Sequence, residues 1–256
     1  MIIKEPVDSS YGNSKSVEPQ VSASVLCLRR VKQSFEILFV QRPKTSRVAP
    51  EYYVFPGGKI DPEDASDSAL SRLSNTSPTC CSTDVTYPIA LAACRELYEE
   101  VGILVTQDET ESVDSLATMI SLETFYTDLI KAQIKLDISK LHYWLRWITP
   151  KPMPVRFDTY FFVLQVPEQL QVFPHPDEIE NICWMHPQEA LMAYTEGQMP
   201  MLFPTVRNLE QLASLECIDD VITFVREFPK LTIEPTLYRD KTGELELEMP
   251  TNWPIC

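Results

Sequence analysis

The chain has 256 residues, enough for one large domain or two small ones with a substantial buried core. Hydrophobic residues make up 44% of it, yet no apolar run reaches the roughly 18 residues that a membrane span needs. The formal net charge of −15 excludes a basic, nucleic-acid-coating surface, and a polyanionic substrate would need metal ions or a local group of cations to approach.

Seven cysteines are scattered along the chain. Their odd number and the lack of paired Cys-x-x-Cys units predict neither a disulfide framework nor a zinc site, and indicate a reducing, intracellular compartment. Residues 1–20 are polar and lack a secretory signal, so we expect a flexible tail there. We expect a folded domain over residues 21–230 and an acidic, proline-containing C-terminal extension over 231–256.

Apolar and alternating stretches predict strands at residues 21–28 and 35–40, joined by a turn over 29–34, and a short strand at 52–55. Residues 65–87 are rich in Ser, Thr and Asp, which predicts a surface excursion with one short helix near 65–73. A helix over residues 89–101 follows, with Pro88 in its first turn and Gly102 at its end.

Downstream, apolar residues at helical spacing predict helices within residues 108–141, with Asp137 as the cap of a further turn. Strands are expected at 143–148, at 156–164 and through Trp184. Three helices are expected after them: one that begins at Pro187, one over 204–215 and one over 219–228. This order of elements predicts an α/β fold in which helices cover both faces of one mixed sheet.

Three carboxylates share one face of the helix predicted at 89–101. Glu96, Glu99 and Glu100 are related by three or four positions, and like charges at this spacing repel unless a cation lies among them. Closely spaced oxygen ligands suit a hard divalent ion such as Mg²⁺. Arg95 precedes Glu99 by four residues and is placed to orient its carboxylate. The simpler interpretation is an acidic helix face exposed to solvent.

Upstream, Gly57 and Gly58 follow an aromatic, apolar run, which indicates a strand entering a loop where the backbone closely approaches another group. Together the two stretches resemble the signature of the Nudix hydrolase superfamily: Gly, five residues, Glu, seven residues, Arg-Glu-apolar-x-Glu-Glu-x-Gly-apolar. Gly58 fits the opening glycine, and residues 95–103 fit the closing half at every position. Asp64 replaces the middle Glu, and residues 65–94 lie where the family normally has seven residues.

The resemblance implies a Nudix-type α/β/α sandwich with a central mixed β-sheet and extra helices. It also implies hydrolysis of a diphosphate linkage assisted by Mg²⁺ or Mn²⁺. The implied metal ligands are Glu96, Glu99, Glu100, the backbone carbonyl of Gly57 and, directly or through water, Asp64. Arg95 is expected to orient a glutamate. Glu99 is an alternative general base.

Many relatives place a further catalytic carboxylate on a loop opposite the signature helix, and Glu178 is the first candidate for it, with Glu180 the second. The cations nearest in sequence to the glycines are the candidates to hold phosphates, and these are Arg42, Lys44, Arg47 and Lys59. Asp158 is expected to pair with Arg156, and a position facing the site is the alternative. Trp144 and Trp147 are expected in the core or at its rim, or else to stack on an adenine.

Four further stretches, 38–42, 144–150, 156–162 and 178–191, resemble the peroxisomal-type coenzyme A diphosphatase branch of the superfamily. This resemblance implies CoA or acyl-CoA as substrate, with 3′,5′-ADP and (acyl-)phosphopantetheine as products. Two features depart from the branch: no Ser or Ala follows Arg42, and no Gly falls within residues 49–54.

Two alternatives stay open at this point. One is the same chemistry on ADP-ribose, NADH or a dinucleoside polyphosphate, and the other is a nucleotide-binding module without catalysis. The retention of all three glutamates argues against the second. The branch suggests a peroxisomal protein, but the last four residues, Trp-Pro-Ile-Cys, form neither a Ser-Lys-Leu-like address nor a prenylation box, so cytoplasm is the other expectation.

Overall fold

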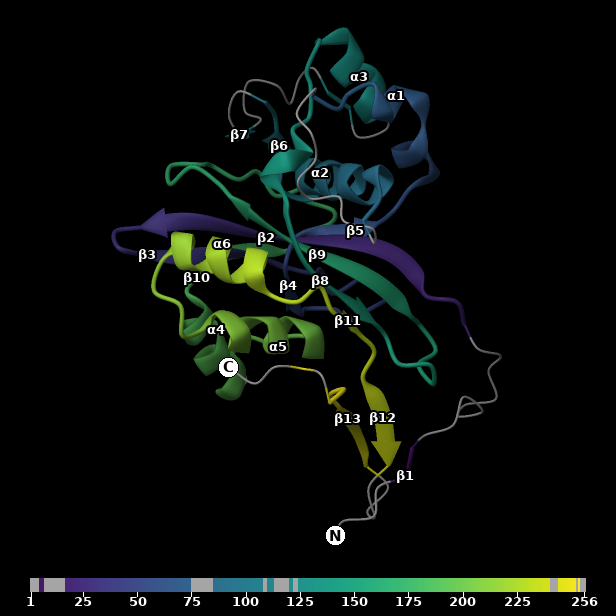
Figure 1. Cartoon of the computed structure of the whole chain (residues 1–256), viewed down its shortest axis with the longest axis vertical. Helices are drawn as coiled ribbons and strands as arrows, with labels where there is room; N and C mark the ends of the chain where they lie inside the picture. Colours follow the sequence, from purple (N-terminus) through teal and green to yellow (C-terminus); the bar gives the residue numbers. More distant parts are fainter. Residues whose placement is uncertain are drawn as a thin grey trace.

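The structure is a computed structural model, and it describes residues 5–6, 17–74, 85–107, 110–112, 120–121, 124–239, 244–251 and 253. An eight-stranded sheet forms its centre (Figure 1), with the main strand order β10-β3-β2-β9-β8-β11. The strands are β2 (Gln20–Val31), β3 (Ser34–Gln41), β4 (Tyr53–Val54), β5 (Gly57–Lys59), β8 (His142–Ile148), β9 (Phe157–Gln165), β10 (Asn181–Met185) and β11 (Thr232–Ile233). Because β2 pairs in parallel with β9 and antiparallel with β3, the sheet is mixed, as predicted.

Helices cover both faces of this sheet (Figure 1), which confirms the predicted α/β fold. Helix α2 (Tyr87–Val101) lies on one face, and α4 (Pro187–Thr195), α5 (Phe203–Leu212) and α6 (Ile218–Glu227) lie on the other. Strand alternation explains the two cores: Val25 and Cys27 pack towards α2, whereas Leu26 and Leu28 pack towards α4–α6.

The hairpin between β2 and β3 is tighter than predicted. The strands extend to Val31 and Ser34, so two residues replace the turn expected over 29–34. The first of them, Lys32, has a φ of 56°, the left-handed conformation that such a tight turn requires.

Trp144 and Trp147 are buried in the core beneath α5 and α6, where Trp147 donates a hydrogen bond of 3.0 Å from Nε1 to Oδ1 of Asn208. Their predicted place in the core is confirmed. Because this core lies on the sheet face opposite α2, neither ring can stack on a nucleotide held at α2.

Residues beyond the glycines and beyond α2 form a lobe beside that helix (Figure 1). It contains η1 (Pro62–Ala65), α1 (Asp67–Leu70), β6 (Ile103–Val105), β7 (Thr110–Ser112), α3 (Phe125–Lys131) and η3 (Ile138–Lys140). The helix expected near 65–73 is present as α1 and is shorter than predicted. Asp137 caps η3, as predicted, by accepting a hydrogen bond from the amide of Ser139.

Helices were predicted within residues 108–141, and this was wrong for the segments before and after α3. Residues 110–112 form β7, which pairs with β6, and the helix ends before Gln133, whose φ is 58°. A periodic apolar pattern cannot distinguish one helix from a strand, a helix and a turn that all face the same core. Leu116 and Met119, part of that pattern, lie outside the described residues.

The segment after residue 230, expected to be an extension, contributes to the central sheet. Strand β11 pairs in parallel with β8, and Ile233 is fully buried. Strands β12 (Thr236–Arg239) and β13 (Leu245–Glu248) form a separate small sheet with β1 (Glu5–Pro6). Trp253 returns to pack on Trp147, with ring centroids 5.5 Å apart.

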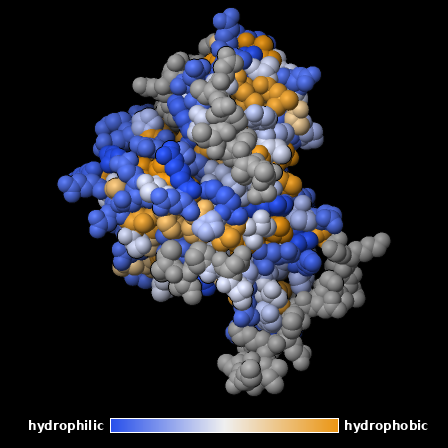
Figure 2. Space-filling view, viewed as in Figure 1, coloured by the Kyte–Doolittle hydropathy of each residue, from blue (hydrophilic) through white to orange (hydrophobic). Residues whose placement is uncertain are grey.

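Hydrophilic residues form a belt across the middle of the face shown in Figure 2, and hydrophobic residues gather there in smaller groups. Within the described part of the chain, no helix is both long enough and apolar enough to cross a membrane.

Candidate active site

The acidic face of α2 lies against the glycine strand β5. The opposite side of the helix is anchored in the core by Leu97, Tyr98 and Val101, which fixes the direction in which the carboxylates point. Glu96 and Glu99 are 12% and 17% exposed at their side chains, and Glu100 is buried. The three glutamates predicted to share a face therefore do so, at a surface that is largely closed to water.

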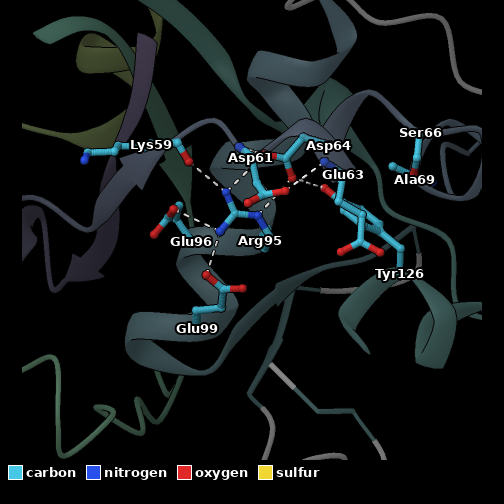
Figure 3. Close-up of polar contacts among 10 residues, drawn as sticks. All are labelled: Lys59, Asp61, Glu63, Asp64, Ser66, Ala69, Arg95, Glu96, Glu99 and Tyr126. Atoms are coloured by element: carbon cyan, nitrogen blue, oxygen red, sulfur yellow. Dashed lines mark hydrogen bonds and ion pairs between the residues drawn. The ribbon is translucent and has the colours of Figure 1, made fainter. Parts of the chain in front are cut away.

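Arg95 lies at the centre of this face (Figure 3) and uses all five of its N–H donors. Its Nε and Nη2 donate to the two oxygens of Asp64 at 2.9 and 3.0 Å, and Nη2 also donates to the carbonyl of Lys59 at 2.8 Å. Its Nη1 donates to Glu96 at 3.0 Å and to Glu99 at 2.6 Å. Three bonds thus fix the guanidinium plane, and the remaining two hold glutamates, which is the orienting role predicted for Arg95.

Asp64 takes a different place from the one expected of a metal ligand. Its side chain is 0% exposed, and its oxygens accept from Arg95, from the amide of Asp61 at 2.8 Å and from the hydroxyl of Tyr126 at 2.6 Å. With both oxygens used and no opening to solvent, Asp64 holds Arg95 in place in this structure. The shorter side chain of Asp keeps this carboxylate close to the turn of η1.

The two glycines allow the strand and the helix to approach each other closely. The amide of Gly57 donates to Oε2 of Glu100 at 2.8 Å, and Gly57 has a φ of 151° where an added Cβ would lie 2.2 Å from the carbonyl oxygen of Ala23. A Cβ on Gly58 would lie 2.4 Å from the carboxylate of Glu96. Only glycine fits at position 57, whereas at position 58 an added Cβ would displace the Glu96 carboxylate.

Burial and mutual repulsion raise the pKa values of the three carboxyl groups. Burial, followed by repulsion from Glu96 and Glu178, raises the pKa of Glu100 to about 8, although the Gly57 amide opposes the shift. Burial likewise raises the pKa of Glu96 to about 7 and also raises that of Glu99, against the opposing charge of Arg95. With all three glutamates ionised, the cluster would carry more negative charge than its one guanidinium balances, and a bound divalent cation relieves that condition.

Among the described residues, no three side chains of His, Cys, Asp or Glu already surround a common point as metal ligands do. Glu96 and Glu99 face Arg95 instead. Both are held by a single atom, Nη1, while Asp64 and Lys59 hold the rest of the guanidinium. Rotation of these two carboxylates towards Glu100 would present oxygen ligands of the kind that Mg²⁺ and Mn²⁺ prefer, so the donor set fits a hard divalent cation.

Glu178 reaches this cluster because its loop is tied to the end of α2. The amides of Phe173 and His175 donate to the carbonyls of Val101 and Glu100, each at 2.9 Å, so the loop satisfies backbone groups that the helix end leaves open. The side chain of Glu178 is exposed, and its charge raises the pKa of Glu96, Glu99 and Glu100. The structure therefore brings together the loop carboxylate and the helix carboxylates that the sequence separates.

The four candidate cations are placed differently. Arg42 is half-buried, with its Nε bound to the carbonyl of Val48 at 3.0 Å, and its charge lowers the pKa of Glu100. Lys44 pairs with Glu51 at 3.6 Å. The side chains of Arg47 and Lys59 are exposed, and that of Lys59 points away from Arg95 in Figure 3. Arg42 is thus the cation that the fold ties most clearly to the cluster.

The predicted pairing of Asp158 with Arg156 was wrong. Asp158 instead accepts two hydrogen bonds from Arg146 on the neighbouring strand β8. Arg156 pairs with Glu234 at 3.0 Å and donates to the carbonyl of Val17. The cross-strand register, in which Asp158 lies opposite Ile148, brings the longer Arg146 side chain diagonally within reach.

One residue of the site, Tyr126, was missed by sequence reasoning. It lies 62 residues from its partner Asp64, on the helix of the lobe, and no spacing pattern connects the two.

The fold and this site together define a Nudix-type protein. A crystal structure of a Nudix hydrolase from Alicyclobacillus acidocaldarius superposes with a TM-score of 0.71 at 26% identity, covering 83% of this chain and 99% of that one. A model of the NUDT19 Nudix domain matches residues 74–212, more than half of the chain. The chain belongs to the NUDT19 Nudix domain family.

Curated relatives give the same family. The chain is 26% identical over 192 residues to putative nudix hydrolase 7 of Caenorhabditis elegans, and 25% identical over 234 residues to the acyl-coenzyme A diphosphatase NUDT19 of Homo sapiens. Each alignment covers 72% of this chain, but only 58% and 62% of the respective relative. The chain thus spans less than two thirds of the length of these two proteins.

Proposed function

We propose that this chain hydrolyses the diphosphate linkage of CoA or acyl-CoA in a metal-dependent reaction, giving 3′,5′-ADP and (acyl-)phosphopantetheine. The observation that carries the proposal is the largely buried glutamate cluster, in which Arg95 holds Glu96 and Glu99 and the Gly57 amide holds Glu100. An excess of desolvated carboxylate serves no structural purpose at a protein surface, whereas it binds divalent cations well. Two curated relatives called acyl-coenzyme A diphosphatase, at 22% and 25% identity, support CoA as the substrate class.

Glu96, Glu99 and Glu100 would hold Mg²⁺ or Mn²⁺, together with the backbone carbonyl of Gly57. The bound cation supplies charge neutralisation for the diphosphate and lowers the pKa of the attacking water. Arg95 stays bound to Asp64 and to the carbonyl of Lys59 throughout, so it fixes the helix face while the glutamates reorient.

Glu178 is the group we assign to accept the proton of the attacking water. It is an exposed carboxylate beside the cluster, on a loop that two backbone hydrogen bonds fix to α2. Its side chain is open to solvent, where an attacking water can reach it, in contrast to the buried Glu100. Arg42, whose charge lowers the pKa of Glu100, is the cation that we assign to the diphosphate oxygens.

The test is a hydrolysis panel of CoA, acyl-CoA, ADP-ribose and NADH with Mg²⁺ or Mn²⁺, with and without EDTA, in which the products are separated by chromatography. We expect metal-dependent release of 3′,5′-ADP from CoA or acyl-CoA. Release of AMP from ADP-ribose or NADH, with CoA left intact, would reject CoA as the substrate and retain the proposed diphosphate hydrolysis. If no substrate in the panel is cleaved with either metal, the chain is a binding module.

A further inference from the structure

Asp64 is a carboxylate that depends wholly on its protein partners. It is 0% exposed, so no water can replace a lost partner, and its Oδ1 accepts from just two groups among those described, Nε of Arg95 and the hydroxyl of Tyr126. The Tyr126 bond, at 2.6 Å, is the shorter of the two. A buried carboxylate oxygen that loses such a donor is left with an unmet acceptor site.

Tyr126 is itself held by the lobe, to which the insertion contributes α1 and the segment that follows it. Its side chain is fully buried on α3, with Phe125 packed edge-on at a centroid distance of 5.0 Å. The segment after α1 fixes this helix, because Arg72 donates to the carbonyls of Leu129 and Ile134 and accepts from the amide of Leu136 at 2.7 Å. The inserted segment therefore helps to hold the helix that carries the Tyr126 hydroxyl behind the active-site face.

We propose that Tyr126 is a positioning residue for the cation site, acting through Asp64 and Arg95 on Glu96 and Glu99. The chain of contacts is continuous. The Tyr126 hydroxyl donates to Asp64, and Asp64 accepts from two donors of the Arg95 guanidinium. The Nη1 group of Arg95 in turn donates to the two glutamates. When these glutamates turn to a cation, Arg95 has to keep its plane without them. Tyr126 maintains the anchor that makes this possible.

The inference rests on the metal-dependent function proposed above, and it assigns a purpose to the residues inserted in the signature. It predicts that Tyr126, which bonds Asp64 and none of the glutamates, affects both metal affinity and turnover. Partners beyond the direct ligands typically change metal affinity or activity by about tenfold to hundredfold.

The experiment compares Tyr126→Phe with Tyr98→Phe in the full chain. The two variants are matched: each keeps its ring and loses one buried tyrosine hydroxyl bond of 2.6 Å, and both rings pack on Phe125. Tyr98 lies on the same helix as the glutamates but bonds the carbonyl of Ile120, outside the Asp64 chain of contacts. Far-UV circular dichroism and the melting temperature in EDTA establish the fold and the stability loss of each.

Mn²⁺ binding, followed by the electron paramagnetic resonance signal of the free ion, is the decisive readout. We expect Tyr126→Phe to weaken Mn²⁺ binding about tenfold and to lower kcat for CoA with KM unchanged, while Tyr98→Phe keeps the wild-type affinity. Unaltered Mn²⁺ affinity in Tyr126→Phe, an equal loss in Tyr98→Phe, or no binding to the wild type would each overturn the inference. Binding without CoA hydrolysis would reject the proposed substrate alone, because the Mn²⁺ comparison does not depend on turnover.

Discussion

Gly58 lies directly against the carboxylate of Glu96: a Cβ built on Gly58 would come within 2.4 Å of Oε2 and 2.5 Å of both other carboxyl atoms. The residue that opens the signature and the first glutamate of its closing half are thus in contact across the strand–helix interface. The clash involves the far end of a flexible side chain, so an extra methyl group would displace the carboxylate and leave the backbone in place.

Gly58→Ala is therefore expected to preserve the fold and to lower turnover about a hundredfold, because misplacing a reacting group by about 1 Å has that effect. Steady-state kinetics and thermal unfolding measure the two quantities. Gly197→Ala is the matched control: its φ of 74° makes alanine strained, by roughly 1 kcal/mol, but no atom lies within 4 Å of the added Cβ. A Gly58→Ala protein with wild-type turnover contradicts the assigned role of Glu96.

Glu100→Gln is expected to abolish Mg²⁺-dependent turnover while the protein stays folded. The amide oxygen can still accept the hydrogen bond from Gly57, so the link between strand and helix survives, but the ligand charge is lost. Product release and far-UV circular dichroism check the two parts. Residual turnover near the wild-type level would remove Glu100 from the site.

The stability of the metal-free protein is expected to fall as the pH rises. The carboxyl of Glu100 has a pKa of about 8 in the folded protein against an ordinary value of 4.5, so between these two values the folded state binds more protons than the unfolded state. Stability is then greatest below the lower value and is lost as the pH rises through the upper one.

Because histidines and other carboxylates titrate in the same range, the measured quantity is the difference in melting temperature between wild type and Glu100→Gln in EDTA. The wild type should lose stability relative to the variant between about pH 5 and about pH 8.5, and added Mn²⁺ should reverse the loss in the wild type alone. A difference that is constant with pH would mean that Glu100 ionises normally.

Glu178→Gln is expected to lower kcat by about a hundredfold or more, the usual contribution of a general base, without changing the melting temperature. The side chain is exposed, so its loss costs little stability. Glu180→Gln, two residues further along and also exposed, is the control and should retain turnover. If the two variants have the same kcat, Glu178 is a surface charge and the base lies elsewhere, with Glu99 the next candidate.

The sequence alone determines which side chains are neighbours within one turn of a helix. The period of 3.6 residues places Glu96, Glu99 and Glu100 on one face and brings Arg95 to Glu99, whatever the rest of the fold does. Local backbone chemistry likewise fixed the end of α2 at Gly102, with a φ of 69°, and favours glycine at Gly57, with a φ of 151°. The order of strands and helices along the chain predicted the mixed sheet with helices on both faces.

Only the tertiary structure decided which distant groups meet that face. The packing of the two cores and the strand register determine which distant residues meet, and neither leaves a spacing pattern in the chain. The resulting pairs are Asp64 with Tyr126, Glu178 with the helix glutamates, and Asp158 with Arg146. Local backbone geometry limits a residue to a few neighbours along the helix or strand. Which of many possible distant partners is brought near depends on the packing of the whole molecule, because burial of apolar surface is non-directional and acts between segments regardless of their separation in sequence.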